Sequence, residues 1–208
     1  MNGAKVLCVS PHPDDTELGM GATLNRFRNK FKTVKLLVLS NRKATRREKH
    51  NRRDQKKAAE ILGIHDIEFR SFPIRFFGTQ QSRDKIRLTI TQVVKRFEPD
   101  IIFTTGMAET MQDHQAVTEE IVRVIRDKSS VLGYEVSKHN RFFRPIAFVN
   151  VSEKDIAMKI AAANVFTEFS NKFYFQPEII RSLARVRAFQ AGYFGYAEAF
   201  EVYRVMVV

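Results

Sequence analysis

The chain has 208 residues, 44% of them hydrophobic, and a formal net charge of +12 at pH 7. This length suits one α/β domain with a sizeable core, so we expect a single domain over residues 1–208. No apolar run approaches the ~20 residues that a bilayer-spanning helix needs, which excludes a membrane span. Cys8 is the one cysteine, and Met1–Lys5 lead directly into a strand. We therefore expect no disulfide within the chain, no signal peptide and a cytoplasmic location.

Apolar segments and amphipathic segments alternate along the chain. The apolar runs are typical of buried strands, whereas apolar residues in the other segments recur at helical spacing. Strands are expected at 6–9, 35–39, 67–69, 101–104, 131–134 and 146–149, with an extended segment at 200–208. Helices are expected from about 17 to 27, through 58–62 to Gly63, over 86–97 and 117–125, from about 154, and over 178–188. Ser152 and Asp155 resemble a capping box at the start of the fifth helix.

This alternation predicts an α/β fold with three layers, in which helices cover both faces of a Rossmann-like, mostly parallel sheet. The usual strand order of such a sheet, 3-2-1-4-5, makes the first and fourth strands neighbours at the topological switch point. Residues that follow these two strands are then expected to meet across one crevice.

The first strand ends in a block of metal-ligand residue types. His12-Pro13-Asp14-Asp15 is followed closely by Glu17, at a turn between strand and helix where open α/β sheets place their active sites. Asp14 or Asp15 could instead cap the helix, and His12 could be a turn residue. Capping explains one such residue but not the whole block, so we favour a metal or catalytic site.

The loop after the fourth strand carries a second set of ligand types, Asp113 and His114. The expected strand order brings them opposite His12, Asp14 and Asp15. Two histidines and a carboxylate around an open position are the ligands of a hydrolytic zinc site, and a remaining carboxylate would serve as the base.

The segment from Arg42 to Lys57 has nine basic and two acidic residues, a net charge of +7. Such a segment could attract an anionic substrate or nucleic acid, or form the solvated face of a surface helix. It has no interleaved aromatic residues that would stack on bases, so nucleic acid is the less favoured partner.

Several segments together resemble a known family. His12-Pro13-Asp14-Asp15-Thr16-Glu17-Leu18-Gly19 resembles the signature of the PIG-L/LmbE-like N-deacetylases, zinc enzymes that remove acetyl groups from N-acetylglucosamine-type substrates. Residues 112–117 resemble their second motif, and 132–135 and 196–202 resemble further family blocks. The resemblance runs from the first strand to the C-terminus and implies an LmbE-like fold. It is closest to members associated with bacterial surface-sugar biosynthesis.

The resemblance implies roles at the matching positions. His12, Asp15 and His114 would bind zinc or another divalent metal, and Asp14 would be the general base. Asp113 would orient a partner from outside the ligand set.

Three further positions are assigned on the same grounds or on charge. Tyr196 aligns with a tyrosine that helps to stabilise the oxyanion. Arg53 and Arg75 are expected contacts of the sugar or its phosphate, with a surface or ion-pair role as the alternative for each.

The chain departs from the family pattern at two positions. The second motif usually begins with a histidine that acts as an acid or stabilises the transition state, and here this position, which would face the substrate, is Met111. A thioether can do neither at useful strength. Ile74 stands where relatives often carry an aspartate that contacts the sugar.

Three functions follow from these observations. The first is a zinc-dependent N-deacetylase acting on an N-acetylated sugar or sugar nucleotide. The second is a metal- and sugar-binding relative that has lost turnover through Met111, and the third is a basic nucleic-acid-binding protein. His50, His65 and His139 are expected at the surface. The aromatic residues within 166–175 are expected in the core or in a homo-oligomer contact.

Overall fold

The computed structural model describes residues 2–40, 48–125 and 128–206, with the backbone alone for 48–50. Seven strands form one sheet in the order β3-β2-β1-β4-β5-β7-β6. The first five strands are mutually parallel, and β7 is antiparallel to both of its neighbours. The strands are β1 (Lys5–Ser10), β2 (Thr33–Ser40), β3 (Asp66–Phe72), β4 (Ile101–Thr105), β5 (Ser130–Tyr134), β6 (Ala147–Val151) and β7 (Tyr196–Arg204). The expected mostly parallel sheet and the 3-2-1-4-5 order are confirmed.

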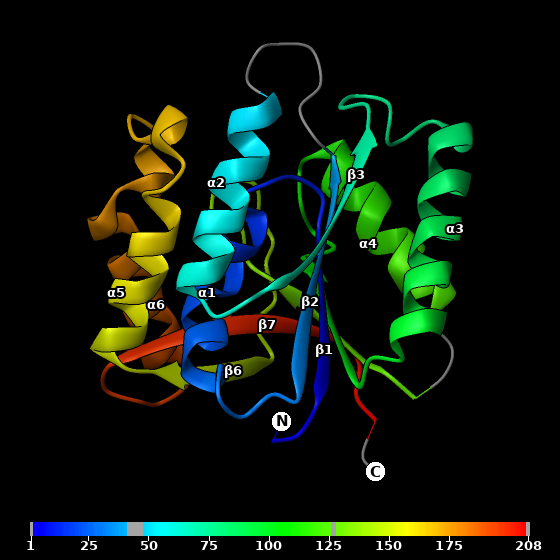
Figure 1. The fold of residues 1–208 in the computed structure, drawn as a ribbon. Helices are drawn as coiled ribbons and strands as arrows, with labels where there is room; N and C mark the ends of the chain where they lie inside the picture. Colours follow the sequence, from blue (N-terminus) through cyan, green and yellow to red (C-terminus); the bar gives the residue numbers. More distant parts are fainter. Residues whose placement is uncertain (1, 41–47, 126–127, 207–208) are drawn as a thin grey trace.

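Helices cover both faces of this sheet, which is seen nearly edge-on in Figure 1. One layer holds α1, α2, α5 and α6, and the other holds α3 and α4. The helices are α1 (Asp15–Phe27), α2 (Glu48–Ile61), α3 (Gln80–Phe97), α4 (Gln112–Val124), α5 (Glu153–Ala163) and α6 (Pro177–Gln190). The three-layer α/β/α class is therefore confirmed.

Alternation along β1 divides the core between the two layers. Val6 and Cys8 pack in the hydrophobic cluster under α1, α2, α5 and α6, whereas Leu7 and Val9 pack in the cluster under α3 and α4. Successive side chains of a strand point to opposite faces, so a strand covered on both sides is apolar throughout. This is why the first strand reads as a continuous apolar run.

Helix α1 is kinked and held close to the sheet. Met20 has non-helical angles (φ −144°, ψ 20°), and the carboxylate of Glu198 on β7 accepts hydrogen bonds from the backbone N–H groups of Ala22 and Thr23 just beyond it. Gly19 lies against the Tyr134 ring so closely that a Cβ there would come within 2.1 Å of a ring carbon. The glycine is therefore required for this close packing, because any side chain would push α1 away from β5.

Two details refine the expected element boundaries. Ser152 and Asp155 form the predicted capping box at the start of α5. Helix α2 begins at Glu48, so the second part of the basic segment is helical, and Arg42, Lys43, Arg46 and Arg47 lie outside the described residues.

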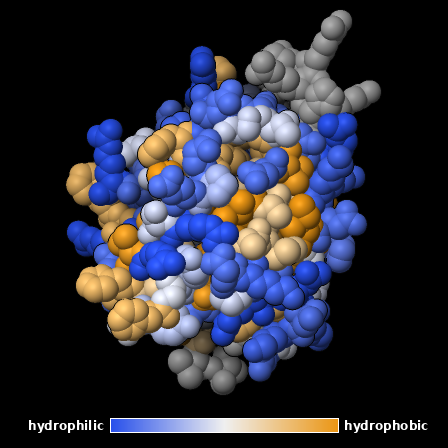
Figure 2. Space-filling model, turned by 90° about the vertical axis from the view of Figure 1, so that its left-hand side faces the viewer, coloured by the Kyte–Doolittle hydropathy of each residue, from blue (hydrophilic) through white to orange (hydrophobic). Residues whose placement is uncertain are grey.

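The face toward α5 and α6 is mainly hydrophilic, with apolar side chains in small separate groups (Figure 2). Apolar side chains elsewhere on the described surface include Phe142, 73% exposed, and Phe194, fully exposed. The expected homo-oligomer stays a prediction. In the described part of the chain, no helix combines the length and the apolar character required to cross a membrane.

Candidate metal centre and active-site cleft

The turn after β1 presents His12 and Asp15 to the carboxyl end of the sheet. The Ser10 hydroxyl donates to the carbonyl oxygen of His12 over 2.8 Å, and the backbone N–H of His12 donates to Oδ2 of Asp15, also over 2.8 Å. Asp14 between them has a left-handed backbone, with φ at 90°. A non-glycine residue in this region is strained, and such strain is found most often at functional sites.

A side chain of helix α2 holds this turn by hydrogen bonds. The side-chain oxygen of Gln55, a fully buried residue, accepts from the backbone N–H of Asp14 at 3.2 Å, and its amide group donates to Glu17 at 2.5 Å. Burial raises the pKa of Glu17 to about 7 against the opposing hydrogen bond from Gln55. The sequence did not single out Gln55, because a glutamine inside a basic segment carries no signal of its own.

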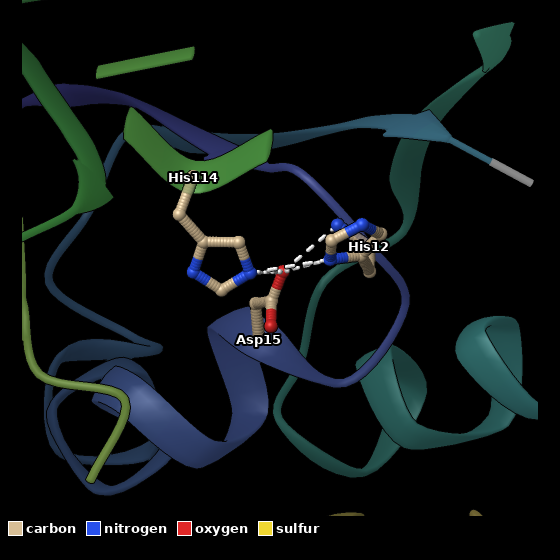
Figure 3. A group of neighbouring side chains, drawn as sticks. All are labelled: His12, Asp15 and His114. Atoms are coloured by element: carbon tan, nitrogen blue, oxygen red, sulfur yellow. Dashed lines mark hydrogen bonds and ion pairs between the residues drawn. The ribbon is translucent and has the colours of Figure 1, made fainter. Parts of the chain in front are cut away.

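His114 approaches the same turn from the first part of α4. Strands β1 and β4 are neighbours, so the loops that follow them meet, as the predicted strand order required. His12, Asp15 and His114 are all buried, and each offers one metal-ligand atom within 4.8 Å of the other two. Figure 3 shows the two imidazole rings turned toward the Asp15 carboxylate.

The spacing of these three atoms matches the coordination sphere of a small cation. Nδ1 of His12 and Nε2 of His114 are 3.2 Å apart, and each lies 3.4 Å from Oδ2 of Asp15. Ligands at bond lengths of roughly 2.0–2.1 Å in a tetrahedron are about 3.3 Å from one another. The three atoms thus have the spacing of one face of such a tetrahedron.

Each imidazole has a carboxylate at its other nitrogen. Nε2 of His12 is 3.0 Å from Oδ2 of Asp113, and Nδ1 of His114 faces Oε2 of Glu109 at 3.5 Å. The Asp113 carboxylate holds a ring proton on Nε2 of His12 by a hydrogen bond, and Glu109, within ion-pair distance of His114 but not hydrogen-bonded to it, favours the proton on Nδ1 electrostatically. Each opposite nitrogen then has a lone pair. Two such lone pairs and the Asp15 carboxylate then converge, an arrangement that fits a divalent cation.

The electrostatics of the cluster favour a positive charge. Burial lowers the pKa of His12, but the hydrogen bonds to Asp113 and Asp15 outweigh it and raise this pKa to about 9. Burial raises the pKa of Asp15, but the nearby His114 and His12 lower it to about 2. The carboxylates therefore stabilise positive charge at this point, whether a proton or a metal ion carries it.

The cluster lies at the base of a cleft of about 460 Å³. Asp14 and Met111 line it, as the sequence predicted, and so does Ile74. Ile74 and Met111 make part of the cleft wall apolar. The lining residues are His12, Asp14, Asp15, Leu18, Ile74, Met111, His114, Val136, Lys138, His139, Phe169, Lys172 and Tyr174.

His139 lines the cleft, whereas the sequence analysis expected it at the surface. It is half-buried in the cleft, and its ring meets that of His114 edge-on with the centroids 5.6 Å apart. Burial and the nearby His114 lower the pKa of His139 to about 4, so the ring is neutral at pH 7. Glu109 was also missed, because neither residue stands at metal-ligand spacing along the chain.

Three residues predicted at the site lie elsewhere. The Arg53 side chain is 60% exposed and pairs with the adjacent Asp54, and Arg75 is exposed with φ at 74°. The Tyr196 hydroxyl accepts a hydrogen bond from Arg185 of α6 at 3.2 Å. None of the three lines the cleft, and their expected sugar contacts and oxyanion role stay predictions.

Comparison with known proteins agrees with this geometry. The sequence matches the family described as GlcNAc-PI de-N-acetylase, or PIG-L, over residues 7–125, a stretch that contains His12, Asp15 and His114. It is 28% identical over 165 residues to the uncharacterized deacetylase YaiS of Escherichia coli K12, covering 76% of this chain and 87% of that protein. It is 29% identical over 110 residues to the diacetylchitobiose deacetylase of Thermococcus kodakarensis, covering 47% of this chain and 39% of that protein.

A solved structure shares the whole architecture. The N,N'-diacetylchitobiose deacetylase of Pyrococcus horikoshii superposes with a TM-score of 0.79 at 19% sequence identity, covering 98% of this chain and 86% of that one. At this level of identity the likeness establishes the fold, whereas the chemistry must be argued from the residues of the site.

Proposed function

The chain belongs to the GlcNAc-PI de-N-acetylase (PIG-L) family, and from that premise we propose that it is a metal-dependent hydrolase of N-acetylated sugars or sugar nucleotides. The observation that carries this proposal is the convergence of His12, Asp15 and His114 at the base of an open cleft that Asp14 also lines. Relatives named as deacetylases, one of them a diacetylchitobiose deacetylase, support the substrate class. On the family resemblance we also propose a role in surface-polysaccharide biosynthesis in the cytoplasm.

The three ligand residues would hold zinc or another divalent cation. Such an ion, when bound, supplies Lewis acidity that activates water and polarises the acyl oxygen of the substrate. The paired carboxylates, Asp113 on His12 and Glu109 on His114, keep the two rings in the orientation that coordination needs.

Asp14 is the proposed general base. Its carboxylate accepts a proton as the oxygen of water adds to the acetyl carbon, and it returns this proton to the amine as the carbon–nitrogen bond breaks. The products are acetate and a free amine. The strained backbone of Asp14, tied to Gln55, fixes the direction of the carboxylate beside the cluster.

Metal analysis combined with an acetate-release screen over N-acetylated sugars and sugar nucleotides tests the proposal. Asp14→Asn should keep the metal and lose turnover, whereas Asp15→Ala and His114→Ala should lose both. Asp84→Asn, which removes an equivalent charge from the surface of α3, is the matched control and should leave both unchanged. Full zinc loading in His114→Ala would contradict the ligand assignment.

A second candidate is a metal- and sugar-binding protein without turnover. Met111 lines the cleft where a hydrogen-bonding side chain would otherwise assist the reaction. Metal and sugar binding without release of acetate from any of the compounds would favour this second function over the first.

A further inference from the structure

The cleft has a histidine that the metal centre does not use. We propose that His139 donates a hydrogen bond to the acyl oxygen of the substrate as negative charge develops there, a role that rests on the proposed deacetylase function. Among the residues that the structure describes, four side chains other than the metal cluster bring N–H or O–H donors to the cleft lining: Lys138, His139, Lys172 and Tyr174.

Among these donors, His139 is the one with a ring contact to the metal cluster. Its ring packs edge-on against His114, a ligand residue. Lys138 and Lys172 are exposed, so they form the outer part of the cleft. The ammonium group of Lys138 lies 4.8 Å from the centre of the Tyr174 ring, which places Tyr174 beside this outer part. The reacting acyl group must sit next to the metal position, which makes His139 the donor best placed to reach its oxygen.

Backbone hydrogen bonds hold His139 in register with the segment that leads into α4. The Thr110 N–H donates to the carbonyl oxygen of His139 at 2.7 Å, and Glu109 forms an antiparallel bridge with Asn140. The His139 N–H donates to the carbonyl oxygen of Val136 at 3.0 Å, which closes the loop on itself. Because these contacts use main-chain atoms, replacing the imidazole leaves the frame in place, and the donor is pre-organised before substrate binds.

The same bridge sets Thr110 opposite His139 and brings Met111, the next residue, to the same cleft. Met111 follows Thr110 directly, and both Met111 and His139 line the cleft. A thioether cannot donate a hydrogen bond, whereas an imidazole ring has at least one N–H donor.

The test uses the zinc-loaded protein and the best substrate from the acetate-release screen. His139→Ala should lower kcat by roughly 10²-fold, the usual effect of removing one oxyanion donor, without loss of zinc. His139→Gln, which keeps an N–H donor, should recover part of this loss. His65→Ala, at an exposed histidine before β3, is the matched control and should leave kcat unchanged.

Two further measurements separate hydrogen bonding from a purely structural effect. Adding Met111→His to the His139→Ala protein should raise kcat at least tenfold, because the new imidazole lines the same cleft as the lost one. In zinc-loaded protein with ¹⁵N-labelled histidine, adding acetate, the reaction product, should shift the His139 ring signals, and His139→Ala should weaken acetate binding.

The outcomes distinguish this inference from the proposed function. If the wild-type protein releases no acetate from any compound, the proposed function and the His139 role both fail. If the wild type turns over but His139→Ala does so equally well, only the His139 role fails. Loss of zinc in His139→Ala, or a kcat loss that neither His139→Gln nor Met111→His reverses, would also overturn it.

Discussion

Two buried polar clusters lie along α1, and they differ in how their charges are balanced. The metal cluster consists of His12, Asp15 and His114 at the start of the helix. The ion-pair cluster, farther along the helix, consists of Lys159 with Glu198 and Arg187 with Glu135. All of these side chains are largely buried. Both clusters therefore lose hydration free energy when the chain folds, and their polar contacts must offset this loss.

In the ion-pair cluster each carboxylate meets a cation of the chain itself. Nζ of Lys159 is 2.6 Å from Glu198, which also accepts two backbone N–H groups of α1, and Nε of Arg187 donates to Glu135 at 2.8 Å. In the metal cluster, one nitrogen of each imidazole ring and one oxygen of the Asp15 carboxylate converge on a common point instead. In the ion-pair cluster, lysine and arginine side chains neutralise the carboxylates, and these pairs hold the fold together. The ligand atoms of the metal cluster instead suit a bound metal cation.

Breaking the ion-pair cluster should have the largest effect on stability. Lys159→Met leaves the Glu198 carboxylate buried without its cation, so the free energy of unfolding should fall by about 3–5 kcal/mol. Urea denaturation followed by circular dichroism measures this. Lys154→Met, at an exposed position of the same helix, should change the free energy by less than about 0.5 kcal/mol. A loss of under about 1 kcal/mol for Lys159→Met would show that Glu198 does not depend on its partner.

Supplying the missing cation should stabilise the metal cluster. Zinc at 100 times its dissociation constant adds about 2.7 kcal/mol if it binds the folded state alone. For a chain of this size, a chelator should then lower the melting temperature by roughly 5–10 °C. Calorimetry with and without zinc measures the shift, and the shift should vanish in Asp15→Ala. An equal shift in that variant would place the stabilising metal elsewhere.

The carboxylates behind the ligands should have an intermediate effect. Glu109→Gln weakens the orientation of the His114 ring, so zinc affinity should fall by roughly 10–100-fold. Competition with a chromophoric chelator gives the dissociation constant. Glu119→Gln removes an exposed carboxylate of α4 and should leave the affinity unchanged. Equal zinc affinity in Glu109→Gln and wild type would mean that Glu109 does not support the ring.

The smallest effects are expected outside both clusters. Arg53→Ala and Arg75→Ala remove exposed side chains that do not line the cleft. Changes of about 0.5 kcal/mol or less correspond to at most a roughly twofold change in KM. Steady-state kinetics with a sugar nucleotide provides the measurement. A tenfold rise in KM would show that these arginines contact the substrate, as the sequence suggested.

The sequence by itself determined the architecture and the metal cluster. Alternating strands and helices predict the parallel sheet and its order, and that order brings His114 to His12 and Asp15. These features are readable because each is local: apolar runs define the strands, and ligand residue types cluster where two strands end. The capping box of Ser152 and Asp155 was readable for the same reason.

Only the tertiary structure decided which side chains around the cluster face it. Arg53 and Gln55 are two residues apart on α2, so they point to nearly opposite sides, yet only packing against the turn at Asp14 makes Gln55 the inward one. His139 reaches the cleft because its loop pairs with residues 109–110, a contact between segments about 30 positions apart. Such directions depend on long-range contacts, and no local pattern of residues encodes them.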